Sequence, residues 1–361
     1  MSGTDYKFFG WIAKDKNAIG NMTWGEYTPK TWTEDDIDIK ITHCGICASD
    51  LHTLRSGWGA TDYPAVVGHE IVGTVVRVGK NVKSHKVGDR VGVGAQSGSC
   101  LNCEYCNEGK EPYCNAGQIG TYNGRWKDNS KSFGGYADYA RVPAHFAFAI
   151  PEGVPSEVAA PLMCGGATLY SPLKQLEAGP GKRIGIVGIG GLGHFGLLFA
   201  KALGADPVAI SHSHSKEEDA KKMGAVEFIA TGDEGYEKKS RRTLDGIVCT
   251  INDEKALEES LPKFATLLKP GGKIILVGLP ERPLEGFKIT PLVMNNVFIG
   301  GSAIAGSKEI PEMLKLVDKV ALKAWVVLRP MEDANKAVVD MEDGKARYRY
   351  VLVNQKNGGK L

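Results

Sequence analysis

One short segment limits the fold of this chain more than any other. Residues 183–193 read Arg-Ile-Gly-Ile-Val-Gly-Ile-Gly-Gly-Leu-Gly, an apolar strand followed by a G-x-G-x-x-G turn at Gly188, Gly190 and Gly193. A helical pattern of apolar residues continues over 192–203. A strand, a glycine turn and a helix in this order predict a βαβ unit in which the turn, with Gly191 and Leu192, binds the pyrophosphate of a dinucleotide. The alternative is a merely flexible glycine loop.

Strands and helices alternate after residue 155, which predicts a parallel sheet. The pattern predicts helices over 155–176, 192–203 and 216–223, and short strands over 183–188, 208–211, 245–250 and 273–278. The preceding residues instead form short strands with glycine turns, at 37–41, 71–78 and 90–93, typical of an irregular β-barrel. Residues 10–32 and 122–133 are predicted loops. Beyond residue 300 we expect a helix over 308–319 and strands over 325–328 and 349–353.

Charge and hydropathy exclude several classes of protein. Lys and Arg number 44 and Asp and Glu 42, for a net charge of +2, which argues against a general nucleic-acid binder or a polybasic membrane protein. Residues 1–10 lack the apolar stretch of a signal peptide, and the uncharged stretch 184–200 is glycine-rich and too short to span a bilayer. We therefore expect a cytosolic protein whose eight cysteines are reduced.

Four of these cysteines form a dense cluster in a polar loop. Cys100, Cys103, Cys106 and Cys114 lie within fifteen residues, a spacing that suits a tetrahedral zinc ion held by four thiolates. Such a site has no open position, so the metal would stabilise the loop rather than react. An iron–sulfur cluster is the alternative, but no Cys-Pro follows Cys114 and no second cluster is present.

Other cysteine and histidine residues are dispersed, and spacing alone does not assign them. Cys44 and Cys47 stand near the end of a predicted strand, His69-Glu70 precedes the strand at 71–78, and Cys164 precedes two glycines. Two cysteines and one histidine could hold a catalytic zinc with one position open to substrate. A buried thiol that merely fills space is the alternative for each cysteine.

The end of the second predicted strand of the α/β region indicates which dinucleotide is bound. An NAD site usually has an acid there to accept the ribose 2′-hydroxyl. This chain instead reads Ser-His-Ser-His-Ser-Lys over 211–216, with no acid. Hydrogen-bond donors and positive charge suit a 2′-phosphate, so we expect NADP(H). The alternative is that these residues are only a polar loop that leads into a helix. The candidate contacts are Ser211, His212, Ser213 and Lys216.

These motifs, in this order, resemble the zinc-containing medium-chain alcohol dehydrogenases, specifically the cinnamyl alcohol dehydrogenase branch. The matching segments are Gly68-His69-Glu70-x2-Gly73-x5-Gly79-x2-Val82, Gly45-Ile46-Cys47-x-Ser49-Asp50, the four-cysteine loop, Cys164-Gly165-Gly166-x-Thr168 and the glycine turn. The resemblance covers nearly the whole chain. It implies an α/β protein with a GroES-like β-barrel catalytic domain, residues 1–157 and 300–361, and a Rossmann domain with a doubly wound parallel sheet, residues 158–299.

The resemblance also implies roles for the dispersed residues. Cys47, His69 and Cys164 become the catalytic zinc ligands, Glu70 an acid that can enter or approach the zinc shell, and Asp50 a group that orients His69. The roles of Cys44 and Cys249 stay open. Zinc polarises the carbonyl of an aldehyde, NADPH delivers hydride, and a proton relay runs from Ser49 through the cofactor ribose to His52.

The implied cofactor and substrate contacts extend further along the chain. Thr168 matches a position at the nicotinamide end and Arg349 one near the pyrophosphate. Thr250, Val277, Gly278 and Ser302 complete the expected cofactor site. Trp58, Tyr122, Met294 and Ile304 are candidate pocket walls, suited to aromatic or medium aliphatic aldehydes, with ordinary packing as the alternative. The resemblance also implies a homodimer through the strand near 298–304.

Two other functions remain open on the sequence. A polyol or sugar dehydrogenase could share the fold, although such enzymes often use NAD and the candidate pocket residues here are bulky. A non-catalytic nucleotide-binding scaffold could also share it, although Ser49, His52 and all the expected ligands are retained. We therefore expect an enzyme with two zinc ions per chain that transfers hydride between NADP(H) and an alcohol or aldehyde.

Overall fold

The computed structural model describes residues 4–361 and divides the chain into two units. Unit 1 is Met1–Cys164 with Ala305–Leu361, so it joins the two ends of the chain, and unit 2 is Gly165–Ile304. The α/β class and the combination of a barrel-like sheet with a parallel Rossmann sheet are confirmed. Among residues 4–361, no helix has both the length and the apolar character needed to cross a membrane.

Unit 2 is built on a six-stranded parallel sheet, in the order β12-β11-β10-β13-β14-β15. The order reverses beside β10, which carries the glycine turn at its carboxyl end, and open sheets bind ligands at such a point. The strands are β10 (Arg183–Val187), β11 (Asp206–Ser211), β12 (Glu227–Ala230), β13 (Leu244–Cys249), β14 (Leu268–Leu276) and β15 (Phe298–Gly301).

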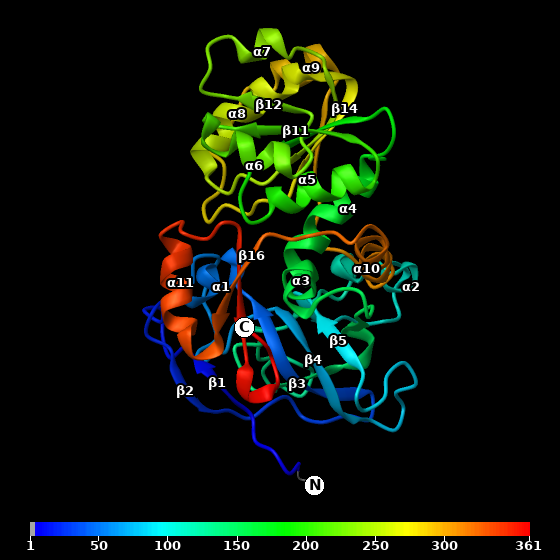
Figure 1. Ribbon diagram of the computed structural model, residues 1–361, viewed down its shortest axis with the longest axis vertical. Helices are drawn as coiled ribbons and strands as arrows, with labels where there is room; N and C mark the ends of the chain where they lie inside the picture. Colours follow the sequence, from blue (N-terminus) through cyan, green and yellow to red (C-terminus); the bar gives the residue numbers. More distant parts are fainter. Residues whose placement is uncertain (1–3) are drawn as a thin grey trace. The chain divides into compact units, whose positions relative to one another are not determined.

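Helices pack on these strands because their apolar faces have no other place to be buried. Helix α5 lies against β10 and β11, and α8 lies against β14. Figure 1 shows α5 beside β11 within this unit. Phe264 and Leu261 of α8 join the buried cluster formed with β13. The helices are α4 (Ala167–Gln175), α5 (Gly193–Ala202), α6 (Glu217–Lys222), α7 (Tyr236–Lys239), α8 (Glu254–Leu267) and α9 (Thr290–Asn295), with a 3₁₀ turn η4 (His214–Lys216).

Unit 1 contains a seven-stranded sheet in the order β16-β17-β3-β4-β5-β9, with β8 also paired to β3. Its pairs are antiparallel except β16 with β17. The strands of this sheet are β3 (Asp36–Gly45), β4 (Glu70–Val78), β5 (Arg90–Val93), β8 (Tyr139–Pro143), β9 (Ala147–Ala149), β16 (Val326–Pro330) and β17 (Arg349–Val353). Two smaller pairs are β1 (Phe9–Ile12) with β2 (Thr23–Glu26), and β6 (Gln96–Gly98) with β7 (Ile119–Gly120).

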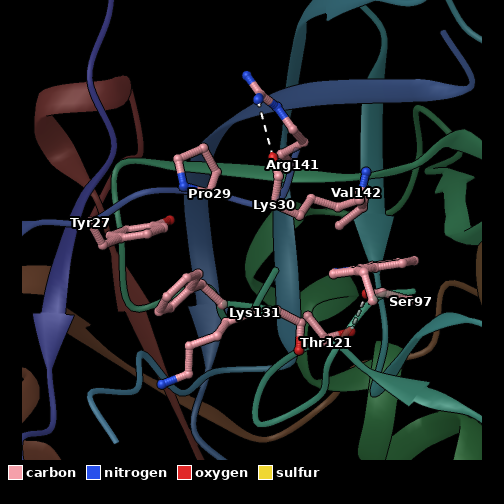
Figure 2. Close-up of a pocket in the computed structure, with 11 residues that line it drawn as sticks. Tyr27, Pro29, Lys30, Ser97, Thr121, Lys131, Arg141 and Val142 are labelled. Carbon is pink, nitrogen blue, oxygen red and sulfur yellow. Dashed lines mark hydrogen bonds between the residues drawn. The ribbon is translucent and has the colours of Figure 1, made fainter. Parts of the chain in front are cut away.

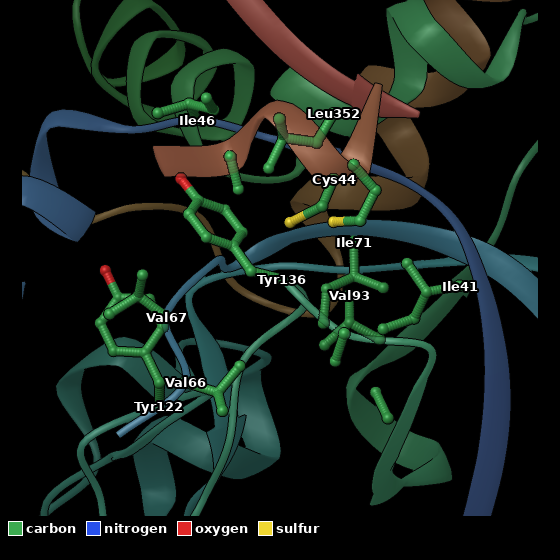
Figure 3. Packing of buried hydrophobic residues seen from close by; sticks show 14 of the residues in the cluster. Ile41, Cys44, Ile46, Val66, Val67, Ile71, Val93, Tyr122, Tyr136 and Leu352 are labelled. Carbon is green, nitrogen blue, oxygen red and sulfur yellow. The ribbon is translucent and has the colours of Figure 1, made fainter. Parts of the chain in front are cut away.

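Short helices connect these strands. The α-helices are α1 (Ala48–Leu54), α2 (Glu104–Glu108), α3 (Ser156–Pro161), α10 (Glu309–Val320) and α11 (Ala334–Glu342). The 3₁₀ turns are η1 (Glu111–Tyr113), η2 (Ala144–Phe146), η5 (Met331–Asp333) and η6 (Gln355–Asn357). Figure 3 shows part of the core, where Ile41, Ile71, Val93 and Leu352 from β3, β4, β5 and β17 are wholly buried in the same cluster as Tyr136.

Two predictions of local structure are wrong in detail. Residues 10–32 were expected to be a loop, but β1 and β2 pair antiparallel at its ends. Each strand has only four residues, too few for an alternating pattern to stand out. The single helix expected over 155–176 is divided into α3, a π-helical turn η3 (Leu162–Gly166) and α4. The turn contains Gly165 and Gly166, which weaken a regular helix.

Candidate metal and nucleotide sites

Cys47, His69, Glu70 and Cys164 come together in unit 1, although they are spread over more than a hundred residues. One ligand atom from each lies within 4.8 Å of every other, and all four residues are buried. Cys47 precedes α1, His69 precedes β4, and Cys164 lies in the π-helical turn. The two sulfur atoms are 3.9 Å apart, close to the roughly 3.8 Å expected for two thiolates on one tetrahedral zinc ion.

The electrostatics of this cluster suit a cation. The hydrogen bond with Cys164 lowers the pKa of the Cys47 thiol well below its ordinary value and raises that of Cys164. Burial opposes a charge on His69, but the bond to Cys47 and the surrounding negative charges raise its pKa to about 9. Nε2 of His69 and Oε2 of Glu70 have no hydrogen-bond partner within residues 4–361. Such orphaned buried donors and acceptors, with two thiols, fit a zinc ion.

Glu70 is held by a buried ion pair with Arg349 of β17. Both side chains are at most 2% exposed. Burial raises the pKa of Glu70 to about 7 in spite of the neighbouring guanidinium. Gly45 faces Glu70 across β3 and β4, and a Cβ there would lie 2.0 Å from Oε2 of Glu70, so only glycine leaves room for the acid. The arginine expected beside the pyrophosphate therefore bonds, in this structure, to the acid expected beside the metal.

Asp50 joins two of the ligand segments. Its Oδ2 accepts the backbone N–H of Cys47 at 2.9 Å, and its Oδ1 accepts that of Gly68, the residue before His69, at 3.1 Å. The first of these bonds also caps α1, because Asp50 is the third residue of that helix. Sequence reasoning missed the third donor, Tyr136, whose hydroxyl lies 2.8 Å from Oδ2.

The predicted relay residues lie on or beside α1. Ser49 Oγ is 3.5 Å from the sulfur of Cys47. The His52 ring is buried and stacks on Trp58, with ring centroids 4.3 Å apart, and Arg55 lies 3.1 Å from its Nδ1. A hydroxyl and an imidazole thus lie on the one short helix that begins after Cys47.

The four predicted pocket residues fall in both units, and we describe each in its own. In unit 1, Trp58 is 42% exposed, whereas Tyr122 is buried and stacks on the His69 ring, with centroids 5.1 Å apart. In unit 2, Met294 of α9 is 72% exposed, and Ile304 is half-buried with a φ of 41°.

The second metal cluster is the four-cysteine loop. Ligand atoms of Cys100, Cys103, Cys106 and Cys114 all lie within 4.8 Å of one another. Cys103 precedes α2. A hydrogen bond from the backbone N–H of Cys106 lowers the pKa of the Cys103 thiol to about 6. Four sulfur donors at this separation leave no position for a substrate.

Glu111 anchors this loop, and sequence reasoning missed it. It is 1% exposed and accepts hydrogen bonds from His145 and from the backbone and hydroxyl of Ser307. Burial opposes its charge, but these bonds lower its pKa to about 2. A single acid between two cysteines has no motif that would have revealed this role.

The glycine turn has the geometry that a bound pyrophosphate requires. Gly188 has a φ of 84°, which favours glycine, and a Cβ on Gly193 would lie 2.0 Å from the Gly188 carbonyl oxygen. A Cβ on Gly190 would instead meet nothing within 4 Å. The turn therefore leaves open space over Gly190 beside the N-terminus of α5.

The other expected cofactor residues of unit 2 gather at the carboxyl ends of neighbouring strands, save Thr168, which lies in α4. Thr250 follows β13 and bonds to the carbonyl oxygens of Val187 and Gly188 at 2.8 and 3.0 Å. Val277 and Gly278 follow β14, and Ser302 follows β15 and accepts a bond from Gln175. This edge of the sheet is where dinucleotides bind in doubly wound folds.

The loop after β11 carries the polar residues expected at the 2′-phosphate. Lys216 donates to the carbonyl oxygen of Ile189 at 2.7 Å, so it reaches the glycine turn. Ser211 ends the strand, and His212 and Ser213 are exposed. His214 lies within 3.2 Å of carboxylate oxygens of Glu217 and Asp233, which raise its pKa. The end of β11 and the loop that follows it thus offer hydroxyls, imidazoles and the ammonium group of Lys216.

A small pocket elsewhere in unit 1 is less suited to a ligand, although three cations border it. Figure 2 shows Lys30, Lys131 and Arg141 around it, with Arg141 donating to the Lys30 carbonyl oxygen. Each cation already pairs with an acid: Lys30 with Asp36, Lys131 with Asp62, and Arg141 with Asp38.

Comparison with known proteins places these sites in a family. Residues 33–152 match the alcohol dehydrogenase GroES-like domain, and residues 191–319 match the zinc-binding dehydrogenase domain. NADP-dependent alcohol dehydrogenase 6 of Saccharomyces cerevisiae is 45% identical, with 96% of each chain aligned. Among solved structures, a cinnamyl alcohol dehydrogenase of Sorghum bicolor is 34% identical, with a TM-score of 0.90 over 98% of this chain and 99% of that one. The enzyme of the same name from Helicobacter pylori, complexed with NADP(H), is 32% identical, with a TM-score of 0.88 over 97% and 99%.

Three observations point to the same family. They are the order of the two domains, the two clusters of side chains that could hold a metal, and the extent of these similarities. The chain belongs to the zinc-binding alcohol dehydrogenases, in the branch that contains the cinnamyl alcohol dehydrogenases.

Proposed function

We propose that this protein is an NADP-dependent alcohol dehydrogenase that reduces aromatic and medium aliphatic aldehydes to primary alcohols. The observation that carries the proposal is the buried set of Cys47, His69 and Cys164, whose donor atoms lie within 4.8 Å of one another. When bound, zinc supplies Lewis acidity toward a carbonyl oxygen, and NADPH supplies the hydride. Cys100, Cys103, Cys106 and Cys114 hold a second zinc ion that stabilises their loop.

The chain's own residues orient the reactants and move the proton. Asp50 holds the Cys47 and His69 segments in place, and Glu70, paired with Arg349, supplies a carboxylate as the fourth residue of the cluster. Ser49 Oγ donates a proton to the oxygen of the reduced substrate, and His52 takes up a proton from solvent to restore the proton on Ser49; the ribose of a bound cofactor would connect the two side chains. Trp58 and Tyr122 border the substrate with apolar ring faces, and Met294 and Ile304 are the corresponding candidates in unit 2.

The cofactor preference follows from the loop after β11. Gly188, Gly190 and Gly193 hold the pyrophosphate, and Ser211, His212, Ser213 and Lys216 hold the 2′-phosphate. The absence of an acid over 211–216 removes the group that would accept a ribose hydroxyl and repel a phosphate. We extend the cofactor site to Thr168, Thr250, Val277, Gly278 and Ser302.

Assembly and location complete the proposal. β15 is an edge strand of the six-stranded sheet, and Phe298 on it is 59% exposed, beside Val293 and Met294 of α9 at 71% and 72%. An apolar edge of this kind suits pairing with a second copy, so we propose a homodimer. All eight free cysteines are either buried or gathered in a cluster that could hold a metal, which suits a reducing compartment, and we propose the cytosol.

The test compares cofactors, substrates and metal content in one preparation. We expect about two zinc ions per chain and a kcat/KM with cinnamaldehyde at least tenfold higher with NADPH than with NADH. A higher kcat/KM for sorbitol oxidation with NAD would favour a polyol dehydrogenase. One zinc ion per chain and no turnover with any aldehyde would favour a non-catalytic scaffold.

A further inference from the structure

Asp50 is a wholly buried carboxylate whose charge must be satisfied by hydrogen bonds. Two of its donors are the backbone N–H groups of Cys47 and Gly68. The third is the hydroxyl of Tyr136, 2.8 Å from Oδ2. The Cys47 N–H and the Tyr136 hydroxyl both donate to Oδ2 of Asp50. The hydroxyl therefore fixes the orientation of the carboxylate relative to the segments that contain Cys47 and His69.

Tyr136 is itself fully buried and bonded through its backbone on both sides. Its side chain is 0% exposed, and Figure 3 shows the ring inside the core of unit 1. Its backbone N–H bonds to the carbonyl of Val67 at 3.0 Å, and its own carbonyl accepts from Trp11 at 2.8 Å. Gly68, next to the ligand His69, has a φ of 99°, and a Cβ there would lie 2.5 Å from the Tyr136 ring. The ring therefore occupies the space beside Gly68, and its position is tied to the backbone that leads into His69.

We propose that Tyr136 is a positioning residue for the catalytic metal: its hydroxyl orients Asp50, and Asp50 sets the Cys47 and His69 segments at the separation that a zinc ion requires. The inference rests on the proposed metal site at Cys47, His69 and Cys164. Tyr136 does not touch the metal or the substrate and acts only through Asp50. Removing such an outer hydrogen bond typically lowers metal affinity by about 10–100-fold.

The matched experiment removes one buried hydroxyl at a time from the full-length zinc-loaded protein. Tyr136→Phe keeps the ring and loses the bond to Asp50. Tyr27→Phe is the control, because Tyr27 is also a buried tyrosine of unit 1 whose hydroxyl donates to the Tyr139 carbonyl and not to Asp50. Zinc release to a chromophoric chelator is followed over time, and the four-cysteine loop provides an internal reference for the second zinc ion.

We expect Tyr136→Phe to release one zinc ion 10–100-fold faster than the wild type, with the release of the other unchanged, and Tyr27→Phe to match the wild type. Cobalt(II) loaded in place of zinc should show a changed visible spectrum only in Tyr136→Phe. Zinc release and a cobalt spectrum equal to those of the wild type would overturn the inference.

A second variant tests the same hydrogen bond from the side of the carboxylate. Asp50→Asn leaves the tyrosine in place and should accelerate release of the same zinc ion. In the double variant, the effect of Tyr136→Phe should almost vanish, because its route through Asp50 is already broken. Additive effects would contradict the inference, while a wild-type protein with only one zinc ion would contradict the metal site itself.

Discussion

Glu70 and Arg349 form an ion pair in which both side chains are almost wholly buried, next to the cluster of Cys47, His69 and Cys164. A buried charge without a partner is far more costly than an exposed one, so the pair acts as a unit. The pair also affects the pKa of Glu70. Burial raises this pKa and favours the neutral carboxyl group, whereas the positive charge of Arg349 lowers it.

Arg349→Met should destabilise the protein by about 3–5 kcal/mol, because it leaves Glu70 buried without its cation. The double variant Glu70→Gln with Arg349→Met should recover much of that loss, since it removes both charges. Urea denaturation of the four proteins of this cycle measures the coupling. A loss in the double variant equal to the sum of the losses in Glu70→Gln and Arg349→Met would show that the two side chains do not depend on each other.

Gly190→Ala and Gly193→Ala separate two roles of the glycine turn. A Cβ at residue 193 collides with the Gly188 carbonyl oxygen, so Gly193→Ala should lower the melting temperature of the cofactor-free protein. A Cβ at residue 190 meets nothing within 4 Å, so Gly190→Ala should leave that temperature unchanged. It should nevertheless raise the Kd for NADPH about tenfold or more, because the methyl group enters the space that the pyrophosphate approaches. Calorimetry with and without NADPH measures both effects, and a Gly190→Ala protein with wild-type affinity would place the pyrophosphate elsewhere.

Local motifs allowed much of this site to be predicted from the sequence, and long-range contacts explain what was missed. The glycine turn depends on residues within one short segment, so its spacing alone predicts its geometry. Tyr136 and Asp50 are 86 residues apart, and Glu111 and Ser307 are 196 apart. No periodicity relates such pairs, because their members lie on helices and loops of unit 1 that meet only in the folded chain. The choice between Cys44 and Cys47 likewise depended on a family resemblance, and the structure places Cys47 in the cluster while Cys44 is buried in the apolar core.

Lys216→Met should weaken NADPH binding and leave NADH binding nearly unchanged, because only NADPH carries a 2′-phosphate. We expect the KM for NADPH to rise about 10–100-fold, in line with the loss of one charge-assisted hydrogen bond to a phosphate. Lys221→Met is the matched control, since Lys221 pairs with Glu217 on the surface of α6. If both variants raised the KM for NADPH equally, the effect would come from net charge rather than from a contact at Lys216.

Glu111→Gln should loosen the four-cysteine loop, and the loss should depend on pH. The hydrogen bonds from His145 and Ser307 lower the pKa of Glu111 from 4.5 to about 2 despite its burial. A lowered pKa stabilises the folded state fully above pH 4.5, and this contribution is lost as the pH falls from 4.5 to 2. At pH 7 we expect a loss of about 2 kcal/mol, typical of hydrogen bonds to a charged group, and faster zinc release from the loop.

Glu108→Gln, an exposed change in the same loop, should have neither effect. The difference in unfolding free energy between Glu111→Gln and the wild type should be constant from pH 7 to about pH 5 and should shrink as the pH falls from 4.5 to 3; a difference that stays constant down to pH 3 would show that the charge of Glu111 does not hold the loop.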